Sequence, residues 1–398
     1  MTRIRFRIAV VMPLVCALLL LAPPSLLAED VPDEFSDAEF AEVTEPTALA
    51  FLPNDDLLVT SKPGILFHVT SDGTITGNAL DLRADTCDES EQGLLGVAVD
   101  PDFEDNDRIY LFYTFRKGAN SCVNRVSRFE LDGTAVVPGS ERKLLNNMPA
   151  TNGNHNGGDI QFGKDGHLYV SIGEAGVAAN AQRRNLLSGK ILRITADGKI
   201  PPGNPFTGRR TDRCHETGRT SAKRTCREIF ALGLRNPFRI AHDPNAGGTR
   251  FFINDVGDQR WEEINRGTAG ANYGWPRREG PCQRGERKGK SCRQRPKELT
   301  NPIFSYRHDA GIDCRSITGG AFVPDTAGWP AAYDGKYLFA DFACGRIFQL
   351  DPTNNGFSRT PFVTGAGPVI HLAFSPDGDL YYTTFTEDGQ VRRVAFNP

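Results

Sequence analysis

Short apolar runs alternate with polar turns along most of the chain, and one phrase recurs. An apolar strand is followed by a turn containing Pro, Asp or Gly, and then by a second strand rich in Leu, Tyr, Phe and Val. Asp-Gly pairs mark hairpin turns because glycine tolerates the positive φ that these turns need. Alternating β-branched and aromatic residues mark the strands. Six copies occur, at residues 49–59, 96–113, 159–172, 238–253, 320–340 and 372–383.

Six such repeats predict an all-β fold, a six-bladed β-propeller with four strands in each blade. No amphipathic helical pattern of 10–15 residues separates the strands, which disfavours a parallel α/β fold. Residues 35–43 are expected to close the ring with the last blade. Two inserts rich in Gly, Arg and Lys, at 203–227 and 281–296, interrupt the repeats. They are either solvated loops or a lid on the top face.

The start of the chain predicts export. Three arginines within the first seven residues precede an apolar run over residues 8–22, and small residues lead to Ala28. This is the order of a secretory signal peptide. A membrane anchor is the alternative, but the run is shorter than the ~20 residues that a span needs. We expect a signal peptide at 1–28, a single domain at 29–398, and a secreted or periplasmic protein that leaves the membrane after cleavage.

Eight of the nine cysteines lie beyond this segment. An even number in an exported chain predicts disulfide bonds. Their order favours four local bridges, namely Cys87–Cys122, Cys214–Cys226, Cys282–Cys292 and Cys314–Cys344. The 46 basic and 49 acidic side chains give a net charge of −3. Because there is no net basic field, nucleic acid is not an expected partner.

The polar, glycine-rich stretch at residues 151–158 is a candidate for catalysis. His155 lies there among Asn and Gly residues just before a strand, where an imidazole can act as a base near neutral pH. Glu174 lies at the far end of the same hairpin and can return beside His155 to orient its ring. The alternative is that His155 is a structural turn residue.

Two further stretches carry charged groups at strand ends. Pro237 forces Asn236 into an extended conformation, so Arg235 becomes a fixed cation suited to an anion or a carbonyl oxygen. A structural arginine between two blades is the alternative. Residues 254–265 gather carboxylates and carbonyls that suit Ca²⁺, although without the spacing of an EF-hand. A solvated acidic turn is the alternative there.

Together these motifs resemble those of the glucose/sorbosone dehydrogenase family, the soluble quinoprotein aldose dehydrogenases. The resemblance runs from about residue 38 to residue 395. It implies a six-bladed propeller with pyrroloquinoline quinone (PQQ) on the top face near the axis. The motifs that carry it lie at 92–103, 155–158, 189–194, 200–206, 234–237, 263–265 and 272–275.

The resemblance also implies a reaction, the oxidation of an aldose at C1 to its lactone with PQQ as hydride acceptor. His155 matches the base that takes the proton of the anomeric hydroxyl, and Glu174 matches the acid that orients it. Arg235 matches the cation beside the quinone oxygen, and Asn236 its neighbour. The quinone performs the difficult step, while the protein positions and polarises the reactants.

Three further residues acquire roles by resemblance. Gln92 matches a glutamine that contacts the substrate. Gly257 and Asp258 match the loop whose backbone carbonyls hold Ca²⁺ against PQQ. The expected partners are therefore a sugar substrate and an electron acceptor of unknown identity.

The chain departs from the family pattern before its last turn. Active members carry arginines there that bind the carboxylates of the cofactor, whereas residues 367–374 contain none. A lysine common in the preceding blade is also replaced, within residues 340–345. Arg346 and Arg315 are the candidates to substitute. A trianionic cofactor without such partners binds weakly.

This departure leaves two other functions open. The first is a non-catalytic secreted propeller that binds a glycan or a protein ligand. The second is a Ca²⁺-dependent propeller lactonase, which needs a carboxylate and asparagine cage on the axis. The presence of His155, Glu174 and Arg235 together favours the dehydrogenase, and the absence of arginine at 367–374 favours the non-catalytic propeller.

Overall fold

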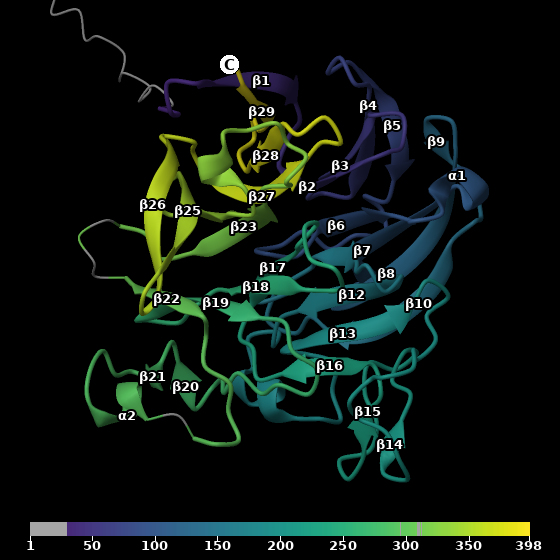
Figure 1. The fold of residues 1–398 in the computed structure, drawn as a ribbon. Helices are drawn as coiled ribbons and strands as arrows, with labels where there is room; N and C mark the ends of the chain where they lie inside the picture. Colours follow the sequence, from purple (N-terminus) through teal and green to yellow (C-terminus); the bar gives the residue numbers. More distant parts are fainter. Residues whose placement is uncertain (1–29, 295, 309–310, 312) are drawn as a thin grey trace, which may run out of the picture.

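The computed structural model describes residues 30–294, 296–308, 311 and 313–398. The predicted signal peptide at 1–28 lies outside the described residues. Six antiparallel sheets stand side by side in a ring (Figure 1), and each contains four strands that run consecutively from the axis to the rim. The fold is thus the predicted six-bladed β-propeller.

The first three blades are formed in chain order. Blade 1 contains β2 (Pro46–Phe51), β3 (Leu57–Ser61), β4 (Ile65–Val69) and β5 (Ile75–Asp81). Blade 2 contains β6 (Leu94–Val99), β7 (Arg108–Gly118), β8 (Ser121–Asp132) and β10 (Arg142–Pro149), with β9 (Ala135–Val136) paired to β8. Blade 3 contains β11 (Ile160–Phe162), β12 (His167–Ile172), β13 (Lys190–Thr195) and β16 (Ile229–Leu232).

The last three blades complete the ring. Blade 4 contains β17 (Pro237–His242), β18 (Phe251–Asp255), β19 (Trp261–Arg266) and β22 (Phe304–Arg307). Blade 5 contains β23 (Ile317–Phe322), β24 (Tyr337–Asp341), β25 (Arg346–Thr353) and β26 (Gly356–Thr364). Blade 6 contains β27 (Val369–Phe374), β28 (Leu380–Thr384), β29 (Gln390–Phe396) and β1 (Phe35–Glu42).

The innermost strands β2, β6, β11, β17, β23 and β27 contact one another in a closed circuit around the axis. Each of the six predicted repeats supplies the two inner strands of one blade. The faces between blades hold most of the apolar core, with side chains such as Leu58, Leu111, Leu192 and Phe339 fully buried. Burying both faces of each sheet in this way is what makes the blades depend on their neighbours.

Strand β1 closes the ring, as predicted for residues 35–43. It pairs antiparallel with β29, from Phe35 opposite Phe396 to Glu42 opposite Gln390. The N-terminal strand therefore becomes the outermost strand of the blade that the C-terminus completes. This pairing joins the two ends of the described chain.

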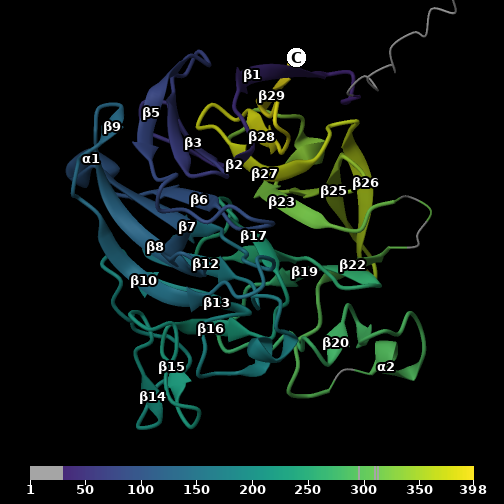
Figure 2. The ribbon, with the colours of Figure 1, turned by 180° about the vertical axis from the view of Figure 1, so that it is seen from behind.

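All four predicted disulfides are present, and two of them close the inserts. The first insert carries β14 (Thr211–Asp212) and β15 (Thr225–Cys226). The second carries β21 (Cys282–Gln283) and α2 (Lys290–Arg293), and β20 (Arg278–Glu279) directly precedes it. Both inserts project from the rim of the ring (Figures 1 and 2).

The remaining helical turns are short, namely α1 (Phe103–Asn106), η1 (Ala178–Gln182) and η2 (Ala331–Tyr333). Within the described part of the chain, no helix combines the length and apolar character that crossing a bilayer requires.

Candidate functional site

His155 and Glu174 are in direct contact. His155 lies in the loop before β11, and Glu174 follows β12 of the same hairpin. The Nδ1 atom of His155 lies 2.5 Å from Oε1 of Glu174, whose side chain is 2% exposed. The left-handed backbone of His155 (φ 56°) turns its ring toward this carboxylate. A carboxylate on Nδ1 fixes the tautomer of an imidazole and leaves Nε2 as the atom that can accept a proton.

Glu91 and Asn236 connect this pair to the fourth blade. Oε2 of Glu91 accepts the backbone N–H of His155 at 2.8 Å and Nδ2 of Asn236 at 3.0 Å. Oδ1 of Asn236 accepts the N–H of Gly157 at 3.0 Å. Gly157 has φ 63°, and a Cβ there would meet backbone atoms at 3.0 Å, so glycine is required. Sequence reasoning missed Glu91, although it directly precedes the motif that begins at Gln92.

The backbone of Arg235 is fixed by hydrogen bonds, whereas one nitrogen of its guanidinium has no hydrogen-bond partner. The backbone N–H of Arg235 donates to both oxygens of the buried Asp255 carboxylate, and the backbone N–H of Asn236 donates to one of them at 2.7 Å. Nη1 of Arg235 donates to the carbonyl of Val256 at 3.2 Å, and the guanidinium lies 5.7 Å from the ring of Trp275. Its Nε is buried without a hydrogen-bond partner. The backbone N–H of Glu174 donates to the Arg235 carbonyl, which brings the three predicted catalytic residues together.

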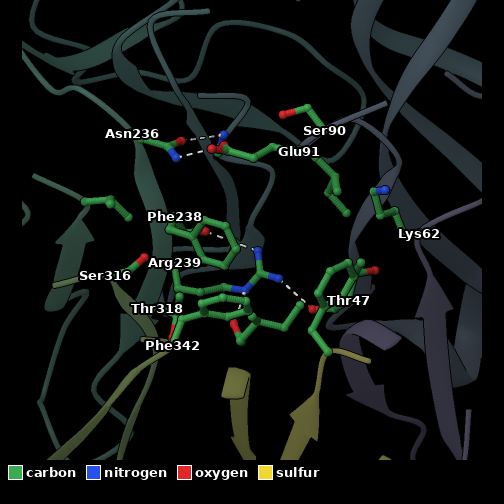
Figure 3. A pocket seen from close by; sticks show the side chains of 15 residues that line it. Thr47, Lys62, Ser90, Glu91, Asn236, Phe238, Arg239, Ser316, Thr318 and Phe342 are labelled. Atoms are coloured by element: carbon green, nitrogen blue, oxygen red, sulfur yellow. Dashed lines mark hydrogen bonds between the residues drawn. The ribbon is translucent and has the colours of Figure 1, made fainter. Parts of the chain in front are cut away.

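A cavity of about 200 Å³ lies at the same end of the axis (Figure 3). All six blades contribute to it. Its lining comprises Thr47, Lys62, Ser90, Glu91, Leu95, Gly157, Asn236, Phe238, Arg239, Val256, Ser316, Thr318, Phe342, Ile370 and Phe385. We refer to it as the axial cavity. Asn236 is the only predicted site residue among these lining residues, while His155 and Arg235 lie beside it through their contacts with Gly157 and Val256.

Gln92 lies apart from the axial cavity. Its side chain is 5% exposed and donates from Nε2 to the carbonyl of Ala150 at 3.0 Å. It lines a neighbouring cavity of about 690 Å³ together with residues of the Cys87–Cys122 bridge. A ligand in the axial cavity would therefore meet Glu91 rather than Gln92.

A second, very small cavity lies between Arg235 and a group of acidic residues. It measures about 10 Å³, the size of one water or ion, and Gly257 contributes to its wall. Its three carboxyl groups are those of Asp255, Glu263 and Glu279. Burial raises the pKa of both Asp255 and Glu263, and the charge of Asp255 raises that of Glu263 further. We refer to this group as the acidic cluster.

Glu279 is the member of the acidic cluster that the sequence did not reveal. Its Oε1 accepts four consecutive backbone N–H groups, from Asp258 to Trp261, at 2.7–3.2 Å. Its Oε2 is buried and has no partner. An unsatisfied buried carboxylate oxygen is costly and therefore indicates a missing cation or water. Glu279 belongs to the short strand β20, far from the stretch whose carboxylates predicted a Ca²⁺ site.

Asp258 does not line this small cavity. Its carboxylate accepts Nη2 of Arg284 at 2.8 Å and lies 3.8 Å from Nη2 of Arg235. Arg284 also lies over the ring of Trp275, at 4.6 Å from its centre. The second insert thus touches the loop that follows β18. In the described residues, the two groups of potential metal ligands within 4.8 Å of one another both contain disulfide cysteines, which are not available to a metal.

The two arginines considered as replacements for the absent family residues do not line the axial cavity. Arg315 is 60% exposed and pairs with Asp313 at 3.4 Å. Arg346 begins β25, opposite Asp341 in the sheet. The cations that do line the cavity are Lys62 and Arg239.

Comparison with known proteins agrees with this architecture. Residues 43–393 match the family model described as Glucose / Sorbosone dehydrogenase. The chain belongs to this family. The match includes blades 1 to 5 and the loops that carry the candidate site residues, and it leaves out only β1 and the end of β29 in blade 6.

Two curated relatives illustrate the range of the family. The aldose sugar dehydrogenase of Escherichia coli is 31% identical over 268 residues, which cover 66% of each chain. The HIPL1 protein of Arabidopsis thaliana is 28% identical over 395 residues, which cover 80% of this chain and 54% of that protein. The chain therefore spans between about half and two thirds of the length of these relatives.

Solved structures share the fold over a larger part of the chain. The apo form of the soluble aldose sugar dehydrogenase from Escherichia coli superposes with a TM-score of 0.76 and 25% identity, covering 91% of this chain and 99% of that one. The PQQ-bound form of aldose sugar dehydrogenase from Streptomyces coelicolor gives 0.69 and 25%, covering 92% and 99%.

Proposed function

We propose that this protein is a quinoprotein sugar dehydrogenase, which oxidises an aldose at C1 to its lactone with PQQ as hydride acceptor. The observation that carries the proposal is the His155–Glu174 pair, 2.5 Å apart, beside an axial cavity. A base oriented by a carboxylate is what removal of a hydroxyl proton needs. Membership of a family with PQQ-bound relatives supports the choice of cofactor.

Each residue of the pair has a distinct task. Glu174 accepts the hydrogen of Nδ1 and holds the ring of His155 in one orientation. Nε2 of His155 then receives the proton of the anomeric hydroxyl. The carboxylate of Glu174 lies against Nδ1, so its negative charge offsets the positive charge that the ring gains with the proton.

The residues around the axial cavity fit a planar anionic cofactor. Phe238, Phe342 and Phe385 offer aromatic surfaces, and Arg235 has an unpartnered Nε at the edge of the site. When bound, PQQ supplies an acceptor for the hydride of C1. The task of Arg235 is to stabilise negative charge next to Asn236, since a fixed cation costs no reorganisation during reaction.

Ca²⁺ fits the acidic cluster and the loop containing Gly257. Glu279 has an unpartnered buried oxygen there, and carboxylate and carbonyl oxygens are the ligands that Ca²⁺ prefers. The carboxylates of Asp255 and Glu263 add negative charge to the wall of the same cavity. A cation bound there would lie next to Arg235, so that the metal and the guanidinium act on the same region. Gly257 borders this cavity and keeps its predicted role as a carbonyl donor in this proposal. Asp258 does not border it, so its role as a carbonyl donor stays a prediction from the resemblance.

A second function, a non-catalytic secreted propeller that binds a glycan or a protein ligand, is favoured by two observations. Strand β27 presents Ile370 to the axial cavity where active relatives are expected to carry arginine. The amide of Gln92 is also engaged by the Ala150 carbonyl. For either function, the four disulfides support export to a secreted or periplasmic location.

The deciding experiment reconstitutes the purified protein with PQQ and Ca²⁺ and measures dye reduction with a panel of aldoses. The expected result is sugar-dependent reduction that disappears when either PQQ or the metal is omitted. PQQ binding without turnover of any aldose would overturn the dehydrogenase and favour the binding propeller. The dye serves as electron acceptor because the natural acceptor is not known.

A further inference from the structure

Two cations from different blades line the axial cavity, and neither is closely paired with a carboxylate. Lys62 follows β3 in blade 1, and Arg239 lies in β17 of blade 4 (Figure 3). Nζ of Lys62 lies 3.9 Å from Glu45, its nearest ionic partner among the described residues. Asp159 acts on Arg239 electrostatically, but the part of the chain that the structure describes shows no ion pair between them.

Arg239 is a buried cation held by neutral groups. Its side chain donates to the carbonyls of Ile370 (3.1 Å), Phe238 (3.1 Å) and Thr47 (2.6 Å). These acceptors belong to the innermost strands of three blades, so they fix the guanidinium on the axis without neutralising it. A guanidinium has five N–H donors, and three hydrogen bonds leave two. Burying a cation is costly unless an anion pairs with it.

The one anion that lines the axial cavity is already engaged. Oε2 of Glu91 accepts two hydrogen bonds, from the His155 backbone and the Asn236 side chain. The charged donors that face the cavity are those of Lys62 and Arg239. Two cations stand against the single carboxylate of Glu91, so the net charge of the described lining residues is positive.

Three phenylalanines give the cavity its shape. Phe238, Phe342 and Phe385 come from blades 4, 5 and 6, and all three line it. Phe342 is 39% exposed, so its ring has surface left to contact a ligand. Aromatic faces bind flat rings by offset stacking. A ligand that satisfies both the walls and the cations is a planar aromatic molecule with acidic groups at its edge.

We propose that Lys62 and Arg239 form the carboxylate-binding pair of the axial cavity and take the place of the arginines absent from residues 367–374. The proposal rests on the proposed function in that it takes PQQ, a planar ring with three carboxylates, as the ligand. The two side chains reach the cavity from opposite blades of the ring. They would therefore bind different edges of one molecule.

The experiment compares PQQ with its neutral trimethyl ester, in binding titrations monitored by calorimetry with Ca²⁺ present. Lys62→Met should weaken PQQ binding by about 10- to 100-fold, because it removes a charge-assisted hydrogen bond between Lys62 and a carboxylate of PQQ. The same change should leave the affinity for the ester within about 3-fold, since the ester has no charge to lose. Lys62→Arg should restore much of the PQQ affinity. Lys143→Met, at an exposed position of β10, is the matched control and should change neither affinity.

Arg239→Met tests the second cation, with circular dichroism to verify folding. If Arg239→Met does not fold, because Arg239 bridges three blades, the Lys62 variants still test the proposal. Equal loss of PQQ and ester affinity in Lys62→Met, or unchanged PQQ affinity, would overturn the inference. Its failure is separable from that of the proposed function by a second aromatic anion, 8-anilinonaphthalene-1-sulfonate. If only this dye binds, and binding needs Lys62, the cavity is an anion site and the dehydrogenase is wrong. If neither ligand binds through Lys62, the inference itself is wrong.

Discussion

At the scale of single residues, the environment of His155 separates its chemistry from ligand binding. Its ring contacts Glu174, whereas the axial cavity is lined by its neighbours Glu91 and Gly157. We expect His155→Gln to reduce turnover of an aldose by about 10²–10⁴-fold, the usual cost of losing a positioned base. The affinity for PQQ should stay within about 3-fold of the wild-type value, because losing one weak contact with the His155 side chain costs less than ~1 kcal/mol.

Steady-state dye reduction and calorimetry on the same preparation measure the two effects. His215→Gln is the matched control. His215 lies in the first insert, where its ring contacts Glu216, and it does not line the axial cavity. Full activity in His155→Gln would show that another group takes the proton.

A different histidine, His242, should make the fold sensitive to acid. It lies between the rings of Tyr169 and Phe251, with centroids at 5.0 Å and 4.9 Å, and both of its ring nitrogens lack hydrogen-bond partners. Burial lowers its pKa from 6.5 to about 4. Between pH 6.5 and pH 4, His242 therefore binds a proton in the unfolded chain but not in the folded chain. Its contribution to stability is complete above pH 6.5 and is lost as the pH falls toward 4.

His242→Phe should remove this loss. Relative to the wild type, the variant is expected to gain roughly 2–3 kcal/mol of stability between pH 7.5 and pH 4.5. Urea unfolding at the two pH values measures the difference, and all other titrating groups cancel in the comparison. A wild-type-to-variant difference that is the same at both pH values would show that His242 is not responsible.

At the scale of strands, ring closure depends on a buried polar contact as well as on the β1–β29 ladder. Asp37 in β1 accepts the hydroxyl of Tyr382 at 2.5 Å and Nε of Arg392 at 3.0 Å, and its side chain is 3% exposed. Asp37→Ala should lower the free energy of unfolding by about 3 kcal/mol, because it removes the carboxylate that accepts two buried hydrogen bonds, one of them from a cation. Glu39→Ala, on the exposed part of the same strand, should cost less than about 0.5 kcal/mol. Equal losses in urea unfolding would contradict this account.

The strands were predictable because their signals are local. Each blade begins with a hairpin whose alternating pattern and turn lie within about twenty residues, and all six were found in the sequence. The contact between His155 and Glu174 was predictable for the same reason, since both residues border the β11–β12 hairpin.

The parts that the sequence did not predict depend on contacts between blades. Lys62, Glu91 and Arg239 meet at one cavity although blades 1, 2 and 4 supply them. Although Glu91 borders the motif that begins at Gln92, no sequence pattern shows which residues of other blades these three meet, because those contacts exist only once the ring has closed. Glu279 was missed because it lies in a two-residue strand just before the second insert, where strand periodicity offers no register from which to infer a partner.

At the scale of the whole molecule, the propeller brings residues from separate segments together at one end of the ring, and the acidic cluster is one such place. Its cavity is walled by Gly233, which precedes blade 4, by Asp255 and Glu263 of blade 4, and by Glu279 of β20. Glu279 also organises the loop from Asp258 to Trp261 through four hydrogen bonds. A cation held there would tie these segments together and stabilise the folded ring.

Ca²⁺ should therefore raise the thermal stability of the protein. A ligand that binds only the folded state at 100 times its dissociation constant adds about 2.7 kcal/mol, which corresponds to a rise of several degrees in Tm. Glu279→Gln retains an oxygen for the four backbone donors but removes the charge, so it should abolish most of this rise without preventing folding. Glu216→Gln, at a side chain that is 82% exposed, is the matched control. Calorimetric scans with Ca²⁺ and with excess chelator measure the shift for each protein. If Glu279→Gln keeps the full Ca²⁺-dependent shift, the ion binds elsewhere and the unpartnered oxygen of Glu279 is satisfied by water.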